Sequence, residues 1–362
     1  MKSTTRFRIP LLLASFVILF SGVWAGLMRM NWQIGLFKPS ILISHGYLMI
    51  PGFLGTLIGL ERAVALQKKW GYLGPLSSAI GAILIINQHD NQIGFLLILI
   101  GSAIMTLMFF VILKIHFINY TITMALGGIS LLVGNLLWGF GLSIYQFITW
   151  WMGFLILTIA GERLELGRLM KLNKNVKRLF VITITIFFLG AIVSLINISI
   201  GQKIASSGMI LLAIWLFQND IARKTIRQDG LPKFIAISLL SGYVWLFIGG
   251  LIGLTNVVLF AGPVYDAYLH SIFLGFVMSM IFAHAPIILP SIINTSEIIF
   301  KPILYLPLVL LHLSLVVRIL GDIILDNQQI RQWGGMLNAI TIFLYFGITI
   351  AYRLKSFKTK KI

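Results

Sequence analysis

The sequence predicts an all-α, polytopic membrane protein with about twelve transmembrane helices, and two observations carry this prediction. Of 362 residues, 59% are hydrophobic and only 10% are charged, whereas a soluble domain carries about 25% charged residues. So few charges cannot cover a water-soluble globule of this size, which excludes a cytosolic enzyme. Apolar stretches of about 20 residues, the length that crosses the hydrocarbon core of a bilayer, recur from end to end.

Each span is set by its apolar run. The first follows three basic residues, as a signal peptide would, but its run is too long and lacks a clear cleavage site, so we keep it as a span. The expected spans are 9–29, 40–63, 71–87, 92–113, 120–142, 146–168, 179–198, 204–219, 234–258, 264–289, 303–321 and 333–353. Because no linker or soluble region interrupts them, residues 1–362 are expected to form a single integral membrane domain.

The positive charges indicate orientation. The chain has 28 Lys and Arg against 10 Asp and Glu, a formal net charge of +18. With a cytoplasmic N-terminus, 23 of the 28 fall in cytoplasmic segments, and the other five are Arg29, Lys38, Lys203, Arg318 and Arg331. By the positive-inside rule, both termini are expected in the cytoplasm of a bacterial-type inner (plasma) membrane. The basicity therefore points to the lipid bilayer as partner, and nucleic acid is not expected.

A repeat divides the spans into three blocks. Gly52-Phe53-Leu54 is followed nine residues after Gly52 by Glu61, and Gly153-Phe154-Leu155 is followed at the same distance by Glu162. Leu274-Gly275-Phe276 is followed in the same register by His284. These stretches lie four spans apart each time, which predicts three pseudo-threefold four-helix blocks. Their approximate limits are 9–118, 119–230 and 231–353.

The repeat places three ionisable residues at one depth near the cytoplasmic face. Glu61, Glu162 and His284 all lie late in spans that run inward. One interpretation makes them polar helix ends, because Arg follows each Glu. The other makes them an inner polar group or a second metal site, since ionisable residues inside spans are costly and usually functional.

Two histidines lie at similar depth near the outer face, His45 in span two and His270 in span ten. Two neutral imidazoles at one depth on different helices are what axial ligation of haem b requires. The chain has no cysteine, which excludes covalent haem attachment, iron–sulfur clusters and thiolate metal sites. The open alternative is that these are two unrelated interfacial residues. Arg318 and Arg331 are candidate partners for haem propionates, because arginine binds carboxylates bidentately; ordinary interfacial anchoring is the alternative.

This arrangement resembles subunit I of the haem–copper oxidases, which has twelve spans in pseudo-threefold blocks. The resemblance implies that His45 and His270 hold a low-spin haem and that Arg318 and Arg331 contact its propionates. It does not extend to the copper centre, because spans six and seven here contain no histidine. Oxygen reduction is therefore not expected.

The chain also resembles the NnrS family of twelve-span bacterial haem proteins linked to nitric oxide. The resemblance lies in the stretches 45–53 and 270–280, in Arg318 at the end of a span and in Trp333 at the start of the last. That family usually has a second His and a Glu where Gly46 to Leu48 stand here. The resemblance implies electron transfer or a response to a small gas such as nitric oxide, with an electron donor or the gas as partner.

Two other classes of function stay open. Intramembrane Glu and His can relay protons, so a proton-coupled secondary transporter that uses intramembrane Glu and His is the alternative. Alternatively, Glu61, Glu162 and His284 hold Zn²⁺ in an enzyme that acts on lipid. The sequence contains no H-E-x-x-H motif, G-x-S-x-G motif or phosphate-binding loop that would support an enzyme.

Overall fold

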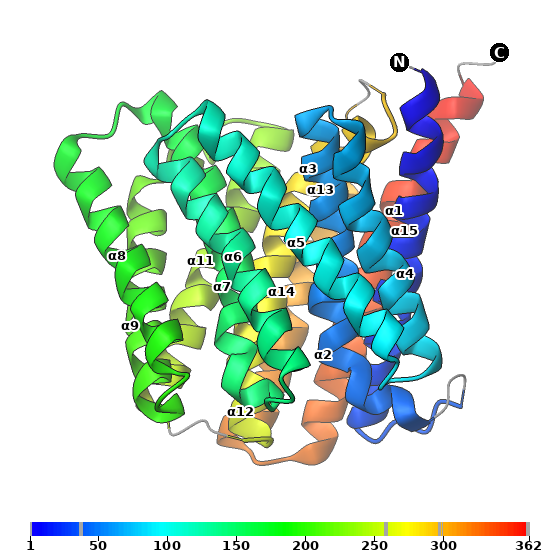
Figure 1. Cartoon of the computed structure of the whole chain (residues 1–362), viewed down its shortest axis with the longest axis vertical. Helices are drawn as coiled ribbons and strands as arrows, with labels where there is room; N and C mark the ends of the chain where they lie inside the picture. The colour runs from blue at the N-terminus through cyan, green and yellow to red at the C-terminus, as the bar shows by residue number, and fades with distance from the viewer. Residues whose placement is uncertain (1, 36–38, 257–259, 296–297, 299, 360–362) are drawn as a thin grey trace. The chain divides into compact units, whose positions relative to one another are not determined.

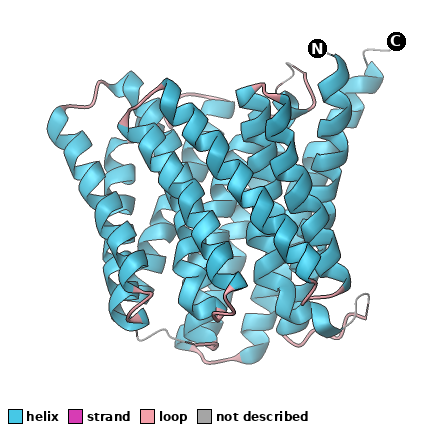
Figure 2. Cartoon of the chain, in the orientation of Figure 1, coloured by secondary structure: helices cyan, strands magenta, loops and turns pink. Residues whose placement is uncertain are grey.

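The computed structural model describes residues 2–35, 39–256, 260–295, 298 and 300–359. Lys38, one of the five cations expected on the outer side, falls outside these residues. Every regular element in the described part of the chain is helical, and no strand occurs there (Figure 2).

Twelve helices within the described residues are long and apolar enough to cross a membrane, which confirms the predicted all-α class and the predicted number of spans. They are Phe7–Arg29, Pro39–Leu66, Lys69–Asn87, Gln92–Ile115, Asn119–Gly139, Ile144–Met170, Lys174–Val193, Ile198–Asn219, Leu231–Thr255, Pro263–Ile292, Pro302–Ile324 and Gln328–Arg353.

The largest errors at the starts of the spans are those of spans seven, eight and twelve, which begin five, six and five residues earlier than expected. Spans seven and eight illustrate the cause. The side chains of Asn173 and Asn197 cap these helices by accepting hydrogen bonds from the backbone N–H groups of Val176 and Ile200. Asparagine is a strong N-cap residue, so the helix begins at the cap even where the following turn is polar. Hydropathy alone detects only the apolar part of each helix.

The chain divides into two compact units, which we describe separately. Unit 1 comprises Met1–Gly161 and Ile292–Thr295. Its main elements are α1 (Lys2–Arg29), η1 (Pro39–Ser44), α2 (His45–Tyr47), η2 (Leu48–Leu54), α3 (Gly55–Leu66), η3 (Lys69–Tyr72), α4 (Leu73–Asn87), α5 (Gln92–Ile115), α6 (Asn119–Gly139) and most of α7 (Ile144–Leu166).

The pairing of α4 with α5 shows how unit 1 is packed. A Cβ atom on Gly94 would lie 2.9 Å from the carbonyl oxygen of Gly81, so the two backbones are in contact there. Small residues allow such close approach between helices in lipid. The opposite side of α5 exposes large apolar side chains at a helical spacing, namely Ile93, Leu96, Ile100 and Leu107. This apolar outer surface is what a helix in contact with lipid acyl chains requires.

Unit 2 comprises Glu162–Ser291 and Ser296–Ile362. It contains the end of α7 with η4 (Gly167–Met170), α8 (Lys174–Val193), α9 (Ile198–Asn219), α10 (Ala222–Thr225), α11 (Leu231–Thr255), α12 (Pro263–His270), η5 (Ser271–Met278), α13 (Ser279–Ile292), η6 (Pro302–Leu304), α14 (Tyr305–Ile319), η7 (Leu320–Ile324) and α15 (Gln328–Thr359). Helices α8, α9 and α11 pack in sequence within this unit (Figure 1).

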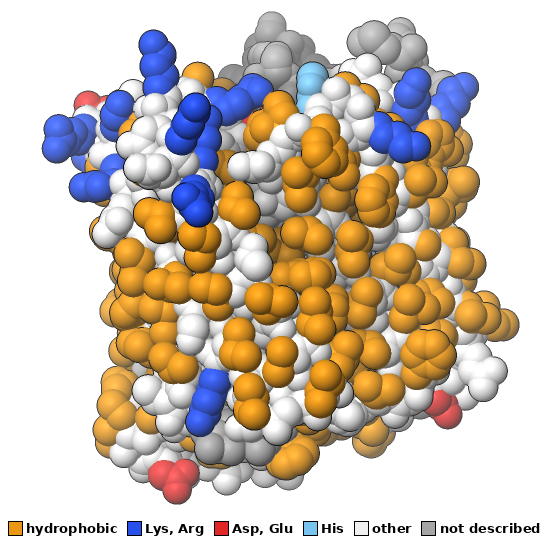
Figure 3. Space-filling model, turned by 60° about the vertical axis from the view of Figure 1, so that its left-hand side comes forward, with side chains coloured by type: hydrophobic (Ala, Val, Ile, Leu, Met, Phe, Trp, Pro, Cys, Tyr) orange, Lys and Arg blue, Asp and Glu red, His pale blue; other side chains and the backbone are white. Residues whose placement is uncertain are grey.

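The surface that carries α8 and α9 is banded. Hydrophobic side chains cover its middle, and Lys and Arg side chains gather toward one end (Figure 3). Lys174, Lys177 and Arg178 lie at the start of α8, and Arg223 and Lys224 follow the end of α9. This distribution is typical of a bundle whose cationic end lies at an anionic membrane surface.

Three helices contain π-helical segments, which are rare and often accompany functional sites. They are η2, η5 and η7. They begin three residues after His45, one after His270 and two after Arg318, respectively. In η2 the break is explained by Pro51, which lacks a backbone N–H. The other two contain no proline, so local sequence does not account for them.

Candidate functional site

His45 begins α2 in unit 1, and its ring packs against α1. Nδ1 lies 2.7 Å from the carbonyl oxygen of Gly22. A Cβ atom on Gly26 would lie 2.7 Å from Cε1 of the ring, so glycine is needed there to make room for the imidazole. Because a carbonyl can only accept, Nδ1 carries the proton in neutral His45, and Nε2 is the basic nitrogen.

The segment around His45 is supported by His89. Its Nδ1 lies 2.8 Å from the hydroxyl of Ser44, and its ring makes an edge contact with Tyr47, 5.2 Å between centroids. Burial lowers the pKa of His89 below its ordinary value, and the neighbouring carboxylate of Asp90 opposes this shift. His89 therefore stays neutral at neutral pH while it contacts both sides of the His45 segment.

His270 ends α12 in unit 2 and contacts a carboxylate. Its Nδ1 lies 2.9 Å from the backbone carbonyl oxygen of Asp266 and 3.2 Å from Oδ1 of the same residue. Both partners accept, so Nδ1 again carries the proton. Arg318 in turn holds the carboxylate bidentately, with Nε 2.7 Å from Oδ2 and Nη2 2.8 Å from Oδ1.

The second predicted arginine, Arg331, lies close to a second carboxylate. Its Nη1 is 3.5 Å from Oδ1 of Asp322, whose side chain is fully buried within η7. Helices α14 and α15 approach closely here, because a Cβ atom on Gly334 would lie 2.6 Å from the backbone nitrogen of Arg318. The structure thus brings together Asp266, His270, Arg318, Asp322 and Arg331, which we call the Asp266 cluster.

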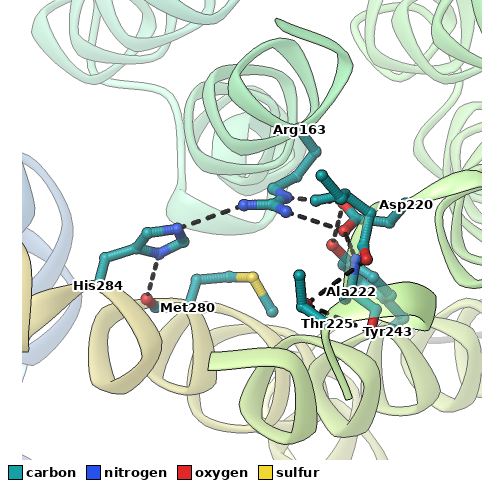
Figure 4. Close-up of polar contacts among 8 residues, drawn as sticks. Arg163, Asp220, Ala222, Thr225, Tyr243, Met280 and His284 are labelled. Atoms are coloured by element: carbon teal, nitrogen blue, oxygen red, sulfur yellow. Dashed lines mark hydrogen bonds and ion pairs between the residues drawn. The ribbon is translucent and has the colours of Figure 1, made fainter. Parts of the chain in front are cut away.

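A second network of polar side chains lies in unit 2 and is shown in Figure 4. Arg163 from α7 points between Asp220 and His284. Its Nε and Nη2 atoms lie 2.7 and 2.8 Å from the Asp220 carboxylate oxygens. Its Nη1 atom lies 3.5 Å from Nε2 of His284. His284 donates from Nδ1 to the carbonyl of Met280 at 2.7 Å. We call Arg163, Asp220, Tyr243 and His284 the Asp220 cluster.

Both carboxylate oxygens of Asp220 accept hydrogen bonds in this network. Besides Arg163, it accepts from the hydroxyl of Tyr243 at 2.9 Å and from the backbone N–H of Ala222 at 2.7 Å. Its side chain is 0% exposed and that of Arg163 is 3% exposed. The cluster therefore ties α7, α10 and α11 together through a buried, fully hydrogen-bonded ion pair.

Each of the two predicted glutamates interacts with the arginine that follows it in the chain. Glu61, in unit 1, accepts from Nη2 of its neighbour Arg62 at 2.9 Å. Glu162, in unit 2, lies close enough to Arg163 to interact with its charge. Among the described residues, no group of three or more His, Asp or Glu side chains is arranged to hold a metal ion. The second metal stays a prediction.

Sequence reasoning missed three carboxylates, Asp220, Asp266 and Asp322. One signal was available, because Asp266 lies four residues before His270, the spacing that places two side chains on one helical face. The partners of Asp220 and Asp322 come from other helices, and spacing along the chain does not reveal them.

Together the fold and these clusters define a polytopic α-helical protein with buried charged side chains inside its apolar spans. The chain belongs to the family described as a domain of unknown function, DUF8744, whose model matches residues 8–354. No curated protein and no solved structure matches the chain.

Proposed function

We propose that this protein is an integral membrane haem-binding protein that acts in electron transfer or in the response to a small gas such as nitric oxide. His45 and His270 are its axial ligands, and it lacks the copper centre of the oxidases. The observation that carries the proposal is the environment of His270, whose Nδ1 faces a backbone carbonyl and the Asp266 carboxylate. Histidines that bind metals almost always donate a hydrogen bond from the N–H of their other ring nitrogen to such a group.

His45 supports the proposal in the same way within its own unit. Its Nδ1 faces the Gly22 carbonyl, so Nε2 is the nitrogen with the lone pair. A π-helical segment also begins three residues after His45 and one residue after His270, a feature that is common at functional sites. The bound haem would supply a redox-active iron that exchanges single electrons or binds a diatomic gas.

The arginines fit the proposal less simply. Asp266 takes the bidentate position on Arg318 that was expected for a haem propionate. Arg318 therefore acts first on His270, by holding Asp266 in place, and this is a positioning role. Arg331, at 3.5 Å from Asp322, is the better candidate for direct contact with a propionate.

The proposal includes a membrane orientation. We place both termini in the cytoplasm of a bacterial-type plasma membrane, because 23 of 28 Lys and Arg residues then lie on the cytoplasmic side. We also retain the pseudo-threefold arrangement of four-helix blocks. The second metal is not part of the proposal, because the Arg163 guanidinium facing His284 opposes a bound cation.

An optical spectrum tests this function. Protein purified in detergent after expression with a haem supply is expected to show a Soret band, which His45→Ala and His270→Ala should each abolish or strongly shift. His116→Ala is the matched control, because His116 is exposed at the end of α5 and should leave the band unchanged. A wild-type protein without a Soret band would contradict the proposal.

A proton-coupled transporter is the second candidate. The buried carboxylates and the non-proline π-helical segments of spans ten and eleven favour it, because interrupted helices and intramembrane acids mark the sites of carriers. Proton-coupled uptake into liposomes that is lost in Glu61→Gln, in a protein without haem, would favour this function over haem binding.

A further inference from the structure

Asp322 is a buried carboxyl group that the proposed function does not use. Its side chain is 0% exposed, and in the described structure neither Oδ1 nor Oδ2 has a hydrogen-bond partner. The Arg331 guanidinium forms an ion pair with it at 3.5 Å, without a hydrogen bond. A buried carboxylate normally accepts several hydrogen bonds, because leaving its charge unsolvated is costly.

The carboxylates of Asp220 and Asp266, also in unit 2, do accept such hydrogen bonds. Asp220 receives hydrogen bonds from Arg163, Tyr243 and Ala222. Asp266 receives two from Arg318 and one contact from His270. Asp322 receives none in the described structure, so donors such as those at Asp220 and Asp266 are missing at this position.

The surroundings of Asp322 also oppose a negative charge. The groups facing it are Asp266 of α12, within hydrogen-bonding reach, Arg318 of α14 and Arg331 of α15. Asp266 is already committed as an anion to Arg318. Two adjacent carboxyl groups in a site of low dielectric constant do not both ionise readily, and the one with fewer donors keeps the proton.

We propose that Asp322 is a proton-binding site: at neutral pH its carboxyl is a neutral acid that donates its O–H to the Asp266 carboxylate. The hydrogen bond supplies the missing partner for one Asp322 oxygen and one more donor for Asp266. When Asp322 releases this proton to water, its carboxylate is left as the ion-pair partner of Arg331. Asp322 becomes neutral again when it takes up a proton from water. This inference does not depend on haem, because it involves only side chains of unit 2.

Infrared spectroscopy of the purified full-length chain in lipid tests this site directly. A protonated carboxylic acid has a carbonyl stretch that an ionised carboxylate lacks, and this band shifts down in D₂O. Label at the aspartate side-chain carbon with ¹³C should shift it further and distinguish it from glutamate. We expect Asp322→Asn to remove the band at neutral pH, and Asp229→Asn to leave it unchanged, because Asp229 is fully exposed.

A second variant keeps the test decisive if Asp322→Asn does not fold. Arg331→Gln removes the cation that favours the anion, so the band should persist to higher pH than in the wild-type protein. The inference would be overturned if the wild-type band were absent at neutral pH and appeared only in Arg331→Gln, since Asp322 would then be an ionised partner of Arg331. Retention of the band in a folded Asp322→Asn variant would also overturn it.

Discussion

Among the described residues of unit 2, two arginine–aspartate pairs share the same geometry, one fully buried and one partly buried, and their surroundings differ. In both, the arginine Nε and Nη2 lie 2.7 and 2.8 Å from the carboxylate oxygens. In the Asp220 cluster, the histidine contacts the arginine, and every carboxylate oxygen has further donors. In the Asp266 cluster, the histidine contacts the aspartate, and a second carboxyl without donors lies beside it.

This difference indicates that an ion pair inside a membrane protein does not identify a function by itself. A closed pair such as Arg163–Asp220 neutralises two charges and ties helices together. An open pair such as Arg318–Asp266 leaves a histidine oriented and a carboxyl available for a proton. The neighbours of each pair therefore separate a structural role from a chemical one.

The largest expected effect comes from breaking the closed pair. Asp220→Ala leaves Arg163 buried without its counter-ion and removes the acceptor of Tyr243, so we expect a loss of about 3–5 kcal/mol in the free energy of unfolding. Thermal unfolding in detergent measures this loss. Asp229→Ala is the control, because its ion pair with Lys233 is exposed at 3.9 Å; equal stability of the two variants would remove the distinction between the clusters.

A smaller effect is expected in the open pair. Asp266→Asn removes the partner of Arg318, but Asp322 can then ionise in its place, so we expect a loss of about 1–3 kcal/mol. The double variant Asp266→Asn/Asp322→Asn should approach the loss seen in Asp220→Ala, because no carboxylate remains near Arg318. If the losses in the free energy of unfolding of the two single variants simply add in the double variant, Asp322 does not replace Asp266 as the partner of Arg318.

The packing of α14 against α15 supports the open pair. Gly334→Ala places a methyl group against the backbone of Arg318, and we expect a loss of about 1–3 kcal/mol from overpacking. Gly347→Ala in the same helix is the control, because nothing lies within 4 Å of a Cβ atom there. Unfolding of both variants in the same detergent compares them; a Gly334 variant as stable as the control would mean that the helices are not in close contact.

The smallest effect concerns pH, at the His45 segment of unit 1. The pKa of His89 is lowered in the folded protein, so the unfolded chain binds a proton first as pH falls. Neutral His89 makes its full contribution to stability above pH about 6.5, the ordinary pKa of histidine. As pH falls from there, this contribution decreases, and it is lost once pH has passed the pKa of His89 in the folded protein. Because His89 is half-buried, we expect less than about 1 kcal/mol after solvent screening. A His89→Gln variant with an unchanged pH dependence of unfolding would contradict this.

The sequence predicted the spans well, because hydropathy over about 20 residues is a property of the local chain. The two histidines with oriented rings, His45 and His270, were also predictable from their depth in the spans. Asp220 was not, because its partner Arg163 lies 57 residues away in the sequence, and Asp322 was not, because Arg331 and Asp266 approach it from other helices. The π-helical segments η5 and η7 contain no proline, so only the three-dimensional structure reveals them.

Titration of the purified, haem-free protein with haem tests the central claim most directly. We predict that a Soret band grows and saturates at one haem per chain, with the low-spin ferric signal of two imidazole ligands in electron paramagnetic resonance. His270→Ala should convert that signal to a high-spin one or prevent saturation. A wild-type titration without saturation, or an unchanged low-spin signal in His270→Ala, would contradict the account.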